Sequence, residues 1–105
     1  MSTTEEIRQQ LISYGNAGWD LSKEHIIIFY IAMANEQLEL QLVSLIQNLG
    51  YKALVDLEEQ GGRPLCFCSH RAIPSLDLLY TMQLEIKQVL ESIEDVYLEG
   101  FWLER

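Results

Sequence analysis

Residues 25–32 read HIIIFYIA, a run of β-branched and aromatic side chains with almost no polar interruption. Its alternating residues fall into two apolar sets, Ile26, Ile28 and Tyr30 on one side and Ile27, Phe29 and Ile31 on the other. A strand that is apolar on both sides is typical of the centre of a sheet whose two faces are covered. The flanking sequence is therefore expected to supply neighbouring strands and covering helices.

Two amphipathic helices are predicted downstream of this strand. In the first, Asn35 is the expected cap, Gly50 follows the C-terminus, and the apolar residues keep helical spacing: Leu38, Leu42, Leu45, Ile46 and Leu49. The second begins at Pro74 and Ser75, and its apolar face is Leu79, Met82, Ile86, Val89, Leu90 and Ile93. Both stripes predict helices that pack on the sheet.

Three further strands are predicted around these helices. Residues 51–58 alternate as a half-buried strand, and Glu59-Gln60-Gly61-Gly62 has the composition of a hairpin turn. The returning strand covers 63–69, with Pro64 expected at its beginning or on a free edge because proline cannot donate to a ladder. The last strand covers 95–103, where the period-two signal is weak.

The chain is expected to begin with a helix over residues 1–15. Ser2, Thr3 and Thr4 before Glu5 and Glu6 form a capping-box pattern, and the apolar residues Ile7, Leu11 and Tyr14 follow at helical spacing. A turn comes next, in which Trp19 is the expected anchor of the helix.

The resulting order is one helix followed by β-α-β-β-α-β over residues 25–103, in a single domain 1–105. This order predicts an α+β fold of the ferredoxin-like split type, with four antiparallel strands and two helices on one face. The other face would then need a cover for its apolar residues. The N-terminal helix, a second copy in a homodimer, or a partner are the alternatives.

The charge balance narrows the class of partner. Seven Lys and Arg against sixteen Asp and Glu give a net charge of −9 over 105 residues. Such a field repels phosphate backbones and anionic lipids, so we expect no direct binding to nucleic acid or membranes and favour a protein with a basic surface. The N-terminal residues lack signal-peptide features, and the two cysteines lie too close in sequence for an unstrained disulfide, so a cytoplasmic location is expected.

Catalytic and metal chemistry find little support in the sequence. Cys66, Cys68 and His70 share one side of a strand, and with His25 they would suit zinc, but they lack the usual Cys-x-x-Cys spacing. Packing is the commoner role of cysteine, so no metal or cofactor is expected. A Cys-His nucleophile pair would have neither an oxyanion hole nor an orienting third group, so we expect no enzyme.

Aromatic residues beside acids are the candidate partner-binding set. They are Trp19, Tyr97, Glu99, Phe101, Trp102 and Glu104. Buried tryptophan and tyrosine dominate the binding energy of interfaces, although core packing is their commoner fate. If the last strand forms the sheet edge, a partner strand could also add to it.

These features resemble the regulator of ribonuclease E activity B family, also called ribonuclease E inhibitor protein B, over nearly the whole chain. The shared points are the N-terminal helix, His25 and Phe29 in the first strand, Leu49-Gly50-Tyr51, a third strand with cysteine, and an aromatic-Gly-aromatic ending. Family members end on Tyr-Asp-Gly-Trp, whereas residues 97–102 read YLEGFW, with an extra residue and no Asp beside the glycine. The resemblance implies a ferredoxin-like fold and a small acidic cytoplasmic protein that binds the endoribonuclease and dampens RNA cleavage.

The expected function is therefore inhibition or modulation of a nuclease by protein binding. An immunity or antidote protein that neutralises a toxic nuclease is one alternative, and a small metal-binding domain built on Cys66, Cys68 and His70 is the other.

Overall fold

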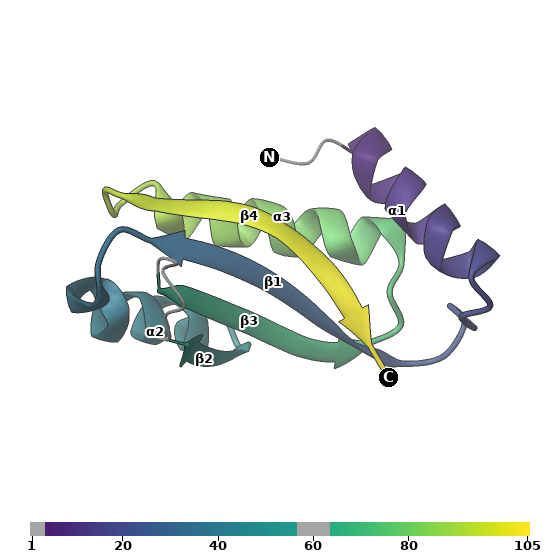
Figure 1. Cartoon of the computed structure of the whole chain (residues 1–105), viewed down its shortest axis with the longest axis horizontal. Helices are drawn as coiled ribbons and strands as arrows, with labels where there is room; N and C mark the ends of the chain where they lie inside the picture. Colours follow the sequence, from purple (N-terminus) through teal and green to yellow (C-terminus); the bar gives the residue numbers. More distant parts are fainter. Residues whose placement is uncertain (1–3, 57–63) are drawn as a thin grey trace.

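The computed structural model describes residues 4–56 and 64–105, which form an α+β structure with one four-stranded antiparallel sheet (Figure 1). Three α-helices lie within these residues, as the sequence predicts, and none of them has the length and hydropathy needed to cross a bilayer. The elements in chain order are α1 (Thr4–Asn16), β1 (His25–Met33), the 3₁₀ helix η1 (Glu36–Leu38), α2 (Glu39–Asn48), β2 (Lys52–Asp56), β3 (Leu65–Ala72), α3 (Leu76–Leu90) and β4 (Val96–Glu104).

The sheet has the strand order β2-β3-β1-β4, which places β1 between two neighbours. β1 pairs with β3 along His25 to Ala32 and with β4 along Ile26 to Met33. The prediction of a central first strand is thus confirmed. β4 and β2 are the two edges of the sheet, a position that matters for binding below.

The core lies between the sheet and the helices α2 and α3, which stand behind the strands in Figure 1. The odd-numbered residues of β1 from Ile27 to Met33 point into it and are fully buried. The helices contribute the predicted stripes, of which the buried members are Leu42, Ile46, Leu79, Met82, Ile86 and Leu90. The last predicted member, Ile93, is also buried in the core, but it lies beyond the end of α3. The odd-numbered apolar residues of β1 are therefore buried in the core, and the even-numbered ones face the opposite side of the sheet.

Helix α1 packs against α3 and along the outer edge of β4. Ile7 is fully buried in the core cluster. Gln10 Nε2 donates to the carbonyl oxygen of Phe101 at 2.7 Å, and Tyr14 Oη accepts from the backbone N–H of Leu103 at 2.9 Å. The predicted N-terminal helix is present as Thr4–Asn16, and the predicted capping residues Ser2 and Thr3 lie outside the described residues. The helix covers the sheet edge, so the alternative in which it covers the second face of the sheet is wrong.

The residues predicted to begin or end the helices do so in most cases. Gly50 has φ +95° directly after α2, and the Ser75 side chain accepts from the backbone N–H of Leu78 to cap α3. Asn35 does not cap α2: its Oδ1 accepts from the backbone N–H of Gln37 at 2.9 Å and starts η1 instead. β3 also runs beyond the predicted end at Ser69, to Ala72, because β1 offers it a pairing partner as far as His25.

A β-bulge in β4 explains the weak period-two signal of the last strand. Tyr30 pairs with Gly100 and Ile31 pairs with Leu98, so Glu99 has no opposite residue in β1. The Tyr30 ring lies over Gly100, where a Cβ atom would come within 3.1 Å of the phenol oxygen. The bulge accommodates Glu99, and the strand continues to Glu104.

Part of the predicted hairpin lies outside the described residues. This applies to residues 57 and 58 of the predicted second strand, the turn Glu59-Gln60-Gly61-Gly62, and Arg63. Pro64 precedes β3, where its carbonyl oxygen accepts from the backbone N–H of Met33 at 3.0 Å. Its predicted place at the beginning of the strand is confirmed.

Candidate functional site

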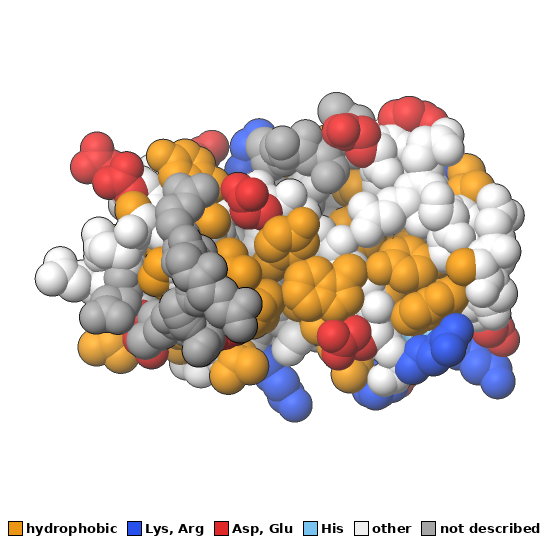
Figure 2. Space-filling view, in the orientation of Figure 1, with side chains coloured by type: hydrophobic (Ala, Val, Ile, Leu, Met, Phe, Trp, Pro, Cys, Tyr) orange, Lys and Arg blue, Asp and Glu red, His pale blue; other side chains and the backbone are white. Residues whose placement is uncertain are grey.

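The side of the sheet turned away from α2 and α3 is the candidate site, and we call it the open face. The register assigns to it alternate residues of all four strands: Ile26, Ile28, Tyr30 and Ala32; Lys52, Leu54 and Asp56; Leu65, Phe67, Ser69 and Arg71; and Tyr97, Gly100, Trp102 and Glu104. Figure 2, seen from this side, shows hydrophobic side chains gathered over the strands. Beside the apolar centre, a pocket of about 240 Å³ opens between Ile26, Lys52, Ser69 and Arg71.

Three aromatic rings form the centre of the open face. The centroid of Trp102 lies 5.2 Å from that of Tyr30 and 5.6 Å from that of Phe67, so rings from β4, β1 and β3 are in contact. Leu54 on β2 is 69% exposed and Tyr97 on β4 is 50% exposed, which extends the apolar area to both edges of the sheet. Such a contiguous exposed patch marks an interaction surface more often than solitary exposed residues do.

Charges of both signs surround this apolar centre. Lys52 and Arg71 are exposed on β2 and β3, and Asp56 lies at the far end of β2. Trp102 Nε1 donates to Glu104 Oε2 at 3.0 Å, which ties the central ring to an acid at its border. An apolar centre with a charged border is the usual anatomy of a protein interface.

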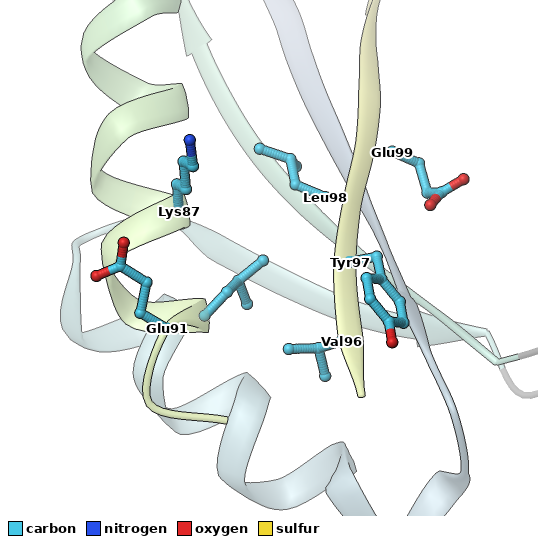
Figure 3. A pocket seen from close by; sticks show the side chains of 7 residues that line it. Lys87, Glu91, Val96, Tyr97, Leu98 and Glu99 are labelled. Carbon is cyan, nitrogen blue, oxygen red and sulfur yellow. The ribbon is translucent and has the colours of Figure 1, made fainter. Parts of the chain in front are cut away.

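Four of the six predicted partner-binding residues lie on this side of the sheet. Tyr97, Trp102 and Glu104 belong to the open face by register, and Figure 3 shows Glu99 pointing away from α3 on the same side as Tyr97. Phe101 does not join them, because it is 4% exposed and packs in the core with its centroid 5.5 Å from that of Phe29.

Trp19 lies away from the open face and anchors α1, as the sequence predicts. Its ring centroid is 4.9 Å from that of Tyr14 and 5.2 Å from that of His25. The guanidinium carbon of Arg105 sits 4.3 Å from the Trp19 ring centroid in a cation–π contact. Trp19 therefore joins the helix to the start of β1 and the end of β4.

Sequence reasoning missed three members of the open face as site residues: Tyr30, Phe67 and Leu54. Each had a usable signal, because each alternates with residues that pack in the core or toward it. Phe67 lies between the buried Cys66 and Cys68, so it must point to the opposite side of β3. An aromatic residue between two buried residues of a strand therefore indicates a ring on the opposite side of the sheet, and this pattern was overlooked.

Cys66, Cys68 and His70 lie on one side of β3, as the sequence predicts, and each is engaged in packing. Cys66 and Cys68 are free and fully buried, opposite Ile31 and Phe29. His70 packs its ring edge-on to a tyrosine of the α2–β2 connection, whereas His25 Nε2 lies 2.7 Å from the carbonyl oxygen of Asp20. Within residues 4–56 and 64–105, no group of three or more His, Cys, Asp or Glu side chains is placed to hold a metal ion.

Burial also makes the two thiols poor nucleophiles. It raises the pKa of Cys66 to about 11, with a smaller contribution from Glu39, and the pKa of Cys68 to about 12, with smaller contributions from Cys66 and Glu85. Because the thiolate is the reactive form, both side chains are suited to packing rather than to catalysis.

We expect the native protein to resist thiol reagents at pH 8 and to react fully once unfolded in urea. Both pKa values are raised above the ordinary 9.0, so the thiols favour the folded state below pH 9 and this contribution is lost as pH rises toward 12. A colorimetric thiol assay with and without urea measures the reactivity, and urea titrations between pH 8 and 11 measure the free energy of unfolding. Rapid reaction of the folded chain with two equivalents of reagent would contradict this placement.

The open face can bury apolar area against another large molecule, and the pocket that Ile26, Lys52, Ser69 and Arg71 line does not include its three aromatic rings. Its rings are held by neighbours on three strands, so little side-chain freedom would be lost on binding.

Comparison with known proteins assigns no family: no protein-family model matches the sequence, and no curated protein matches it significantly.

Proposed function

We propose that this chain is a regulatory protein-binding module, without catalytic activity, that binds a nuclease through the open face and inhibits or modulates it. The observation that carries the proposal is the ring cluster of Tyr30, Phe67 and Trp102, with exposed Leu54 and Tyr97 beside it. The resemblance to the ribonuclease E inhibitor family supports ribonuclease E as the nuclease.

The finer fold assignment belongs to the same proposal. We infer a ferredoxin-like split β-α-β-β-α-β arrangement from the chain order of the elements, the antiparallel pairing and the placement of α2 and α3 on one side. We infer a cytoplasmic location because the chain keeps two free thiols and is strongly acidic. Both inferences agree with a regulator of an intracellular nuclease.

The mechanism has two stages. The net charge of −9 attracts a partner whose surface is basic, as the surfaces of RNA-handling enzymes usually are. The rings of the open face are then buried against that surface, and RNA is excluded from the part of the enzyme that they occupy. Charge governs the rate of encounter, and apolar burial governs the lifetime of the complex.

A pair of leucines on opposite layers of the protein tests this proposal. Leu54 is 69% exposed on the open face, and Leu40 is 80% exposed on α2. We expect Leu54→Ser to weaken binding to purified ribonuclease E of the same organism about tenfold, since burying a leucine contributes about 1.5–3 kcal/mol, and Leu40→Ser to have no effect. Binding is measured by biolayer interferometry, and inhibition by cleavage of a labelled RNA.

The association rate provides a second readout. It should fall as salt is raised, because screening shortens the reach of the acidic field. Equal effects of Leu54→Ser and Leu40→Ser would remove the open face from the mechanism. Absence of binding to ribonuclease E, with recovery of a toxic nuclease in affinity capture from the host, would favour the immunity-protein alternative, and a stable dimer lost in Leu54→Ser would identify the homodimer.

A further inference from the structure

A groove runs between the end of α3 and the beginning of β4, at the free edge of the sheet (Figure 3). Its volume is about 450 Å³. Val96 and Leu98 point into it from β4, and Leu90 lines it from α3, so its floor is apolar. A side chain that enters here from outside would meet the border of the hydrophobic core.

Along Val96–Leu98, the outer side of β4 faces this groove and pairs with no strand among the described residues. The Ala34 N–H donates to the carbonyl oxygen of Asp95 at 2.9 Å, which fixes the alternation at the beginning of the strand. By that alternation the N–H and C=O groups of Val96 and Leu98 point away from β1, toward the free edge. They present the donors and acceptors that an added strand requires.

Helix α1 protects only the other half of the same edge. Gln10 and Tyr14 bond to the outward backbone groups of Phe101 and Leu103, beyond the bulge at Glu99. The helix therefore occupies the C-terminal half of β4 in the way that proteins commonly cover exposed edges. The N-terminal half, Val96–Glu99, lies beside the groove instead.

The charges around the groove specify what can enter it. Glu91 lines it from α3, Glu99 lies at its border with its side chain on the open-face side of β4, Glu94 and Asp95 are exposed in the turn that leads into β4, and Lys87 is the basic lining residue. Four carboxylates against one ammonium group favour a cationic ligand. A second copy of this chain would bring the same acids against them, so edge pairing between two copies is disfavoured.

We propose that the Val96–Glu99 edge binds an extended segment of the partner protein that alternates apolar residues with Lys or Arg. The segment adds to β4, its apolar side chains enter the groove over Leu90 and Leu98, and its basic side chains, which point to the opposite side, meet Glu99, while Glu91 adds negative charge at the border of the groove. This inference rests on the proposed function in that a partner protein supplies the segment, and it adds a second contact beside the open face.

The probe is a short synthetic peptide that alternates valine and lysine, added to the full chain labelled with ¹⁵N. We expect chemical-shift changes along Val96 to Glu99 and slower amide hydrogen exchange at Val96 and Leu98, the two residues whose N–H groups face the edge. Two control peptides, one with glutamate in place of lysine and one with alternate backbone amides methylated, should bind at least tenfold more weakly.

A matched pair of variants separates the groove from net charge. Glu91→Gln with Glu99→Gln should weaken binding of the valine–lysine peptide about tenfold, whereas Glu24→Gln with Asp77→Asn removes two exposed acids elsewhere and should change it little. Leu54→Ser should leave peptide binding intact.

Each failure has a distinct signature. Equal binding of all three peptides, or shifts confined to the open face, would overturn the strand-addition proposal. If ribonuclease E binding depends on Leu54 but is unchanged by Glu91→Gln with Glu99→Gln, the inference fails while the proposed function stands. If the peptide binds as expected and ribonuclease E does not, the groove stands and the nuclease assignment falls.

Discussion

Replacing Trp102 with alanine should weaken the proposed binding to ribonuclease E about 30-fold or more. Trp102 contacts both Tyr30 and Phe67 and occupies the middle of the open face, where a central aromatic residue typically contributes 2 kcal/mol or more to binding. The side chain is only partly buried and lies outside the core cluster, so the free energy of unfolding should fall by about 1–2 kcal/mol. Titration calorimetry and urea unfolding measure the two effects.

Trp19 provides the control, because the same substitution there removes an equal side chain from a different place. Trp19→Ala deletes the contacts with Tyr14, His25 and Arg105 that hold α1, so the free energy of unfolding should fall by about 3 kcal/mol. The affinity of the folded fraction for ribonuclease E should be unchanged. If Trp19→Ala reduces affinity as much as Trp102→Ala, the binding surface includes the α1 junction and the assignment to the open face is wrong.

The central strand could be predicted from sequence because its signal is local. The run from Ile26 to Ile31 is apolar at both parities, which only a two-sided burial explains. The ends of α2 and α3 were also accessible, since Gly50 and Ser75 act through their own backbone conformation and hydroxyl group. The prediction that Asn35 caps α2 was wrong, because its side-chain oxygen accepts from the backbone N–H two residues ahead and so starts a 3₁₀ helix instead.

The position of α1 could not be predicted because it depends on contacts between distant parts of the chain. Its hydrogen bonds from Gln10 to Phe101 and from Leu103 to Tyr14 join residues about 90 positions apart. Helical periodicity identifies the buried face of α1 but does not say whether that face meets a sheet edge or a sheet surface. Three covers for the second sheet face were therefore equally consistent with the sequence.

The sequence predicted both Tyr97 and Trp102 as binding residues, but the bulge that places them on one side of the sheet could not be read from it. Tyr97 and Trp102 are five residues apart, so on a straight strand they would point to opposite sides. The bulge at Glu99 shifts the register, and the two residues pair with Ala32 and Ile28 on the same side of β1.

For the remaining site residues, the sequence alone did not reveal whether the side chain points into the core or to the surface. Phe101 was grouped with Trp102 by its chemical type, although neighbours on a strand point to opposite sides. Tyr30 was recognised as a sheet residue but not as a binding residue, because its exposure depends on which side the helices cover. Chemical type thus selects candidates, and the layer arrangement decides between core and surface.

The adjacent residues Phe29 and Tyr30 provide the sharpest test of this two-sided arrangement, because they leave the same strand in opposite directions. Phe29 is fully buried against Phe101 and opposite Cys68, so Phe29→Ala should lower the free energy of unfolding by about 3–5 kcal/mol, a large share of the 5–15 kcal/mol usual for a domain. Tyr30 is partly exposed, so Tyr30→Ala should cost about 1–2 kcal/mol, mainly from its contacts with Trp102 and its cover over Gly100. In binding the order should reverse, with Tyr30→Ala weakening the complex with ribonuclease E and Phe29→Ala leaving the affinity of its folded fraction unchanged. Urea unfolding followed by circular dichroism, with binding measured on the same preparations, checks both orders. A larger loss of stability for Tyr30→Ala than for Phe29→Ala would mean that the helices cover the other side of β1, and the open face would then have to be reassigned.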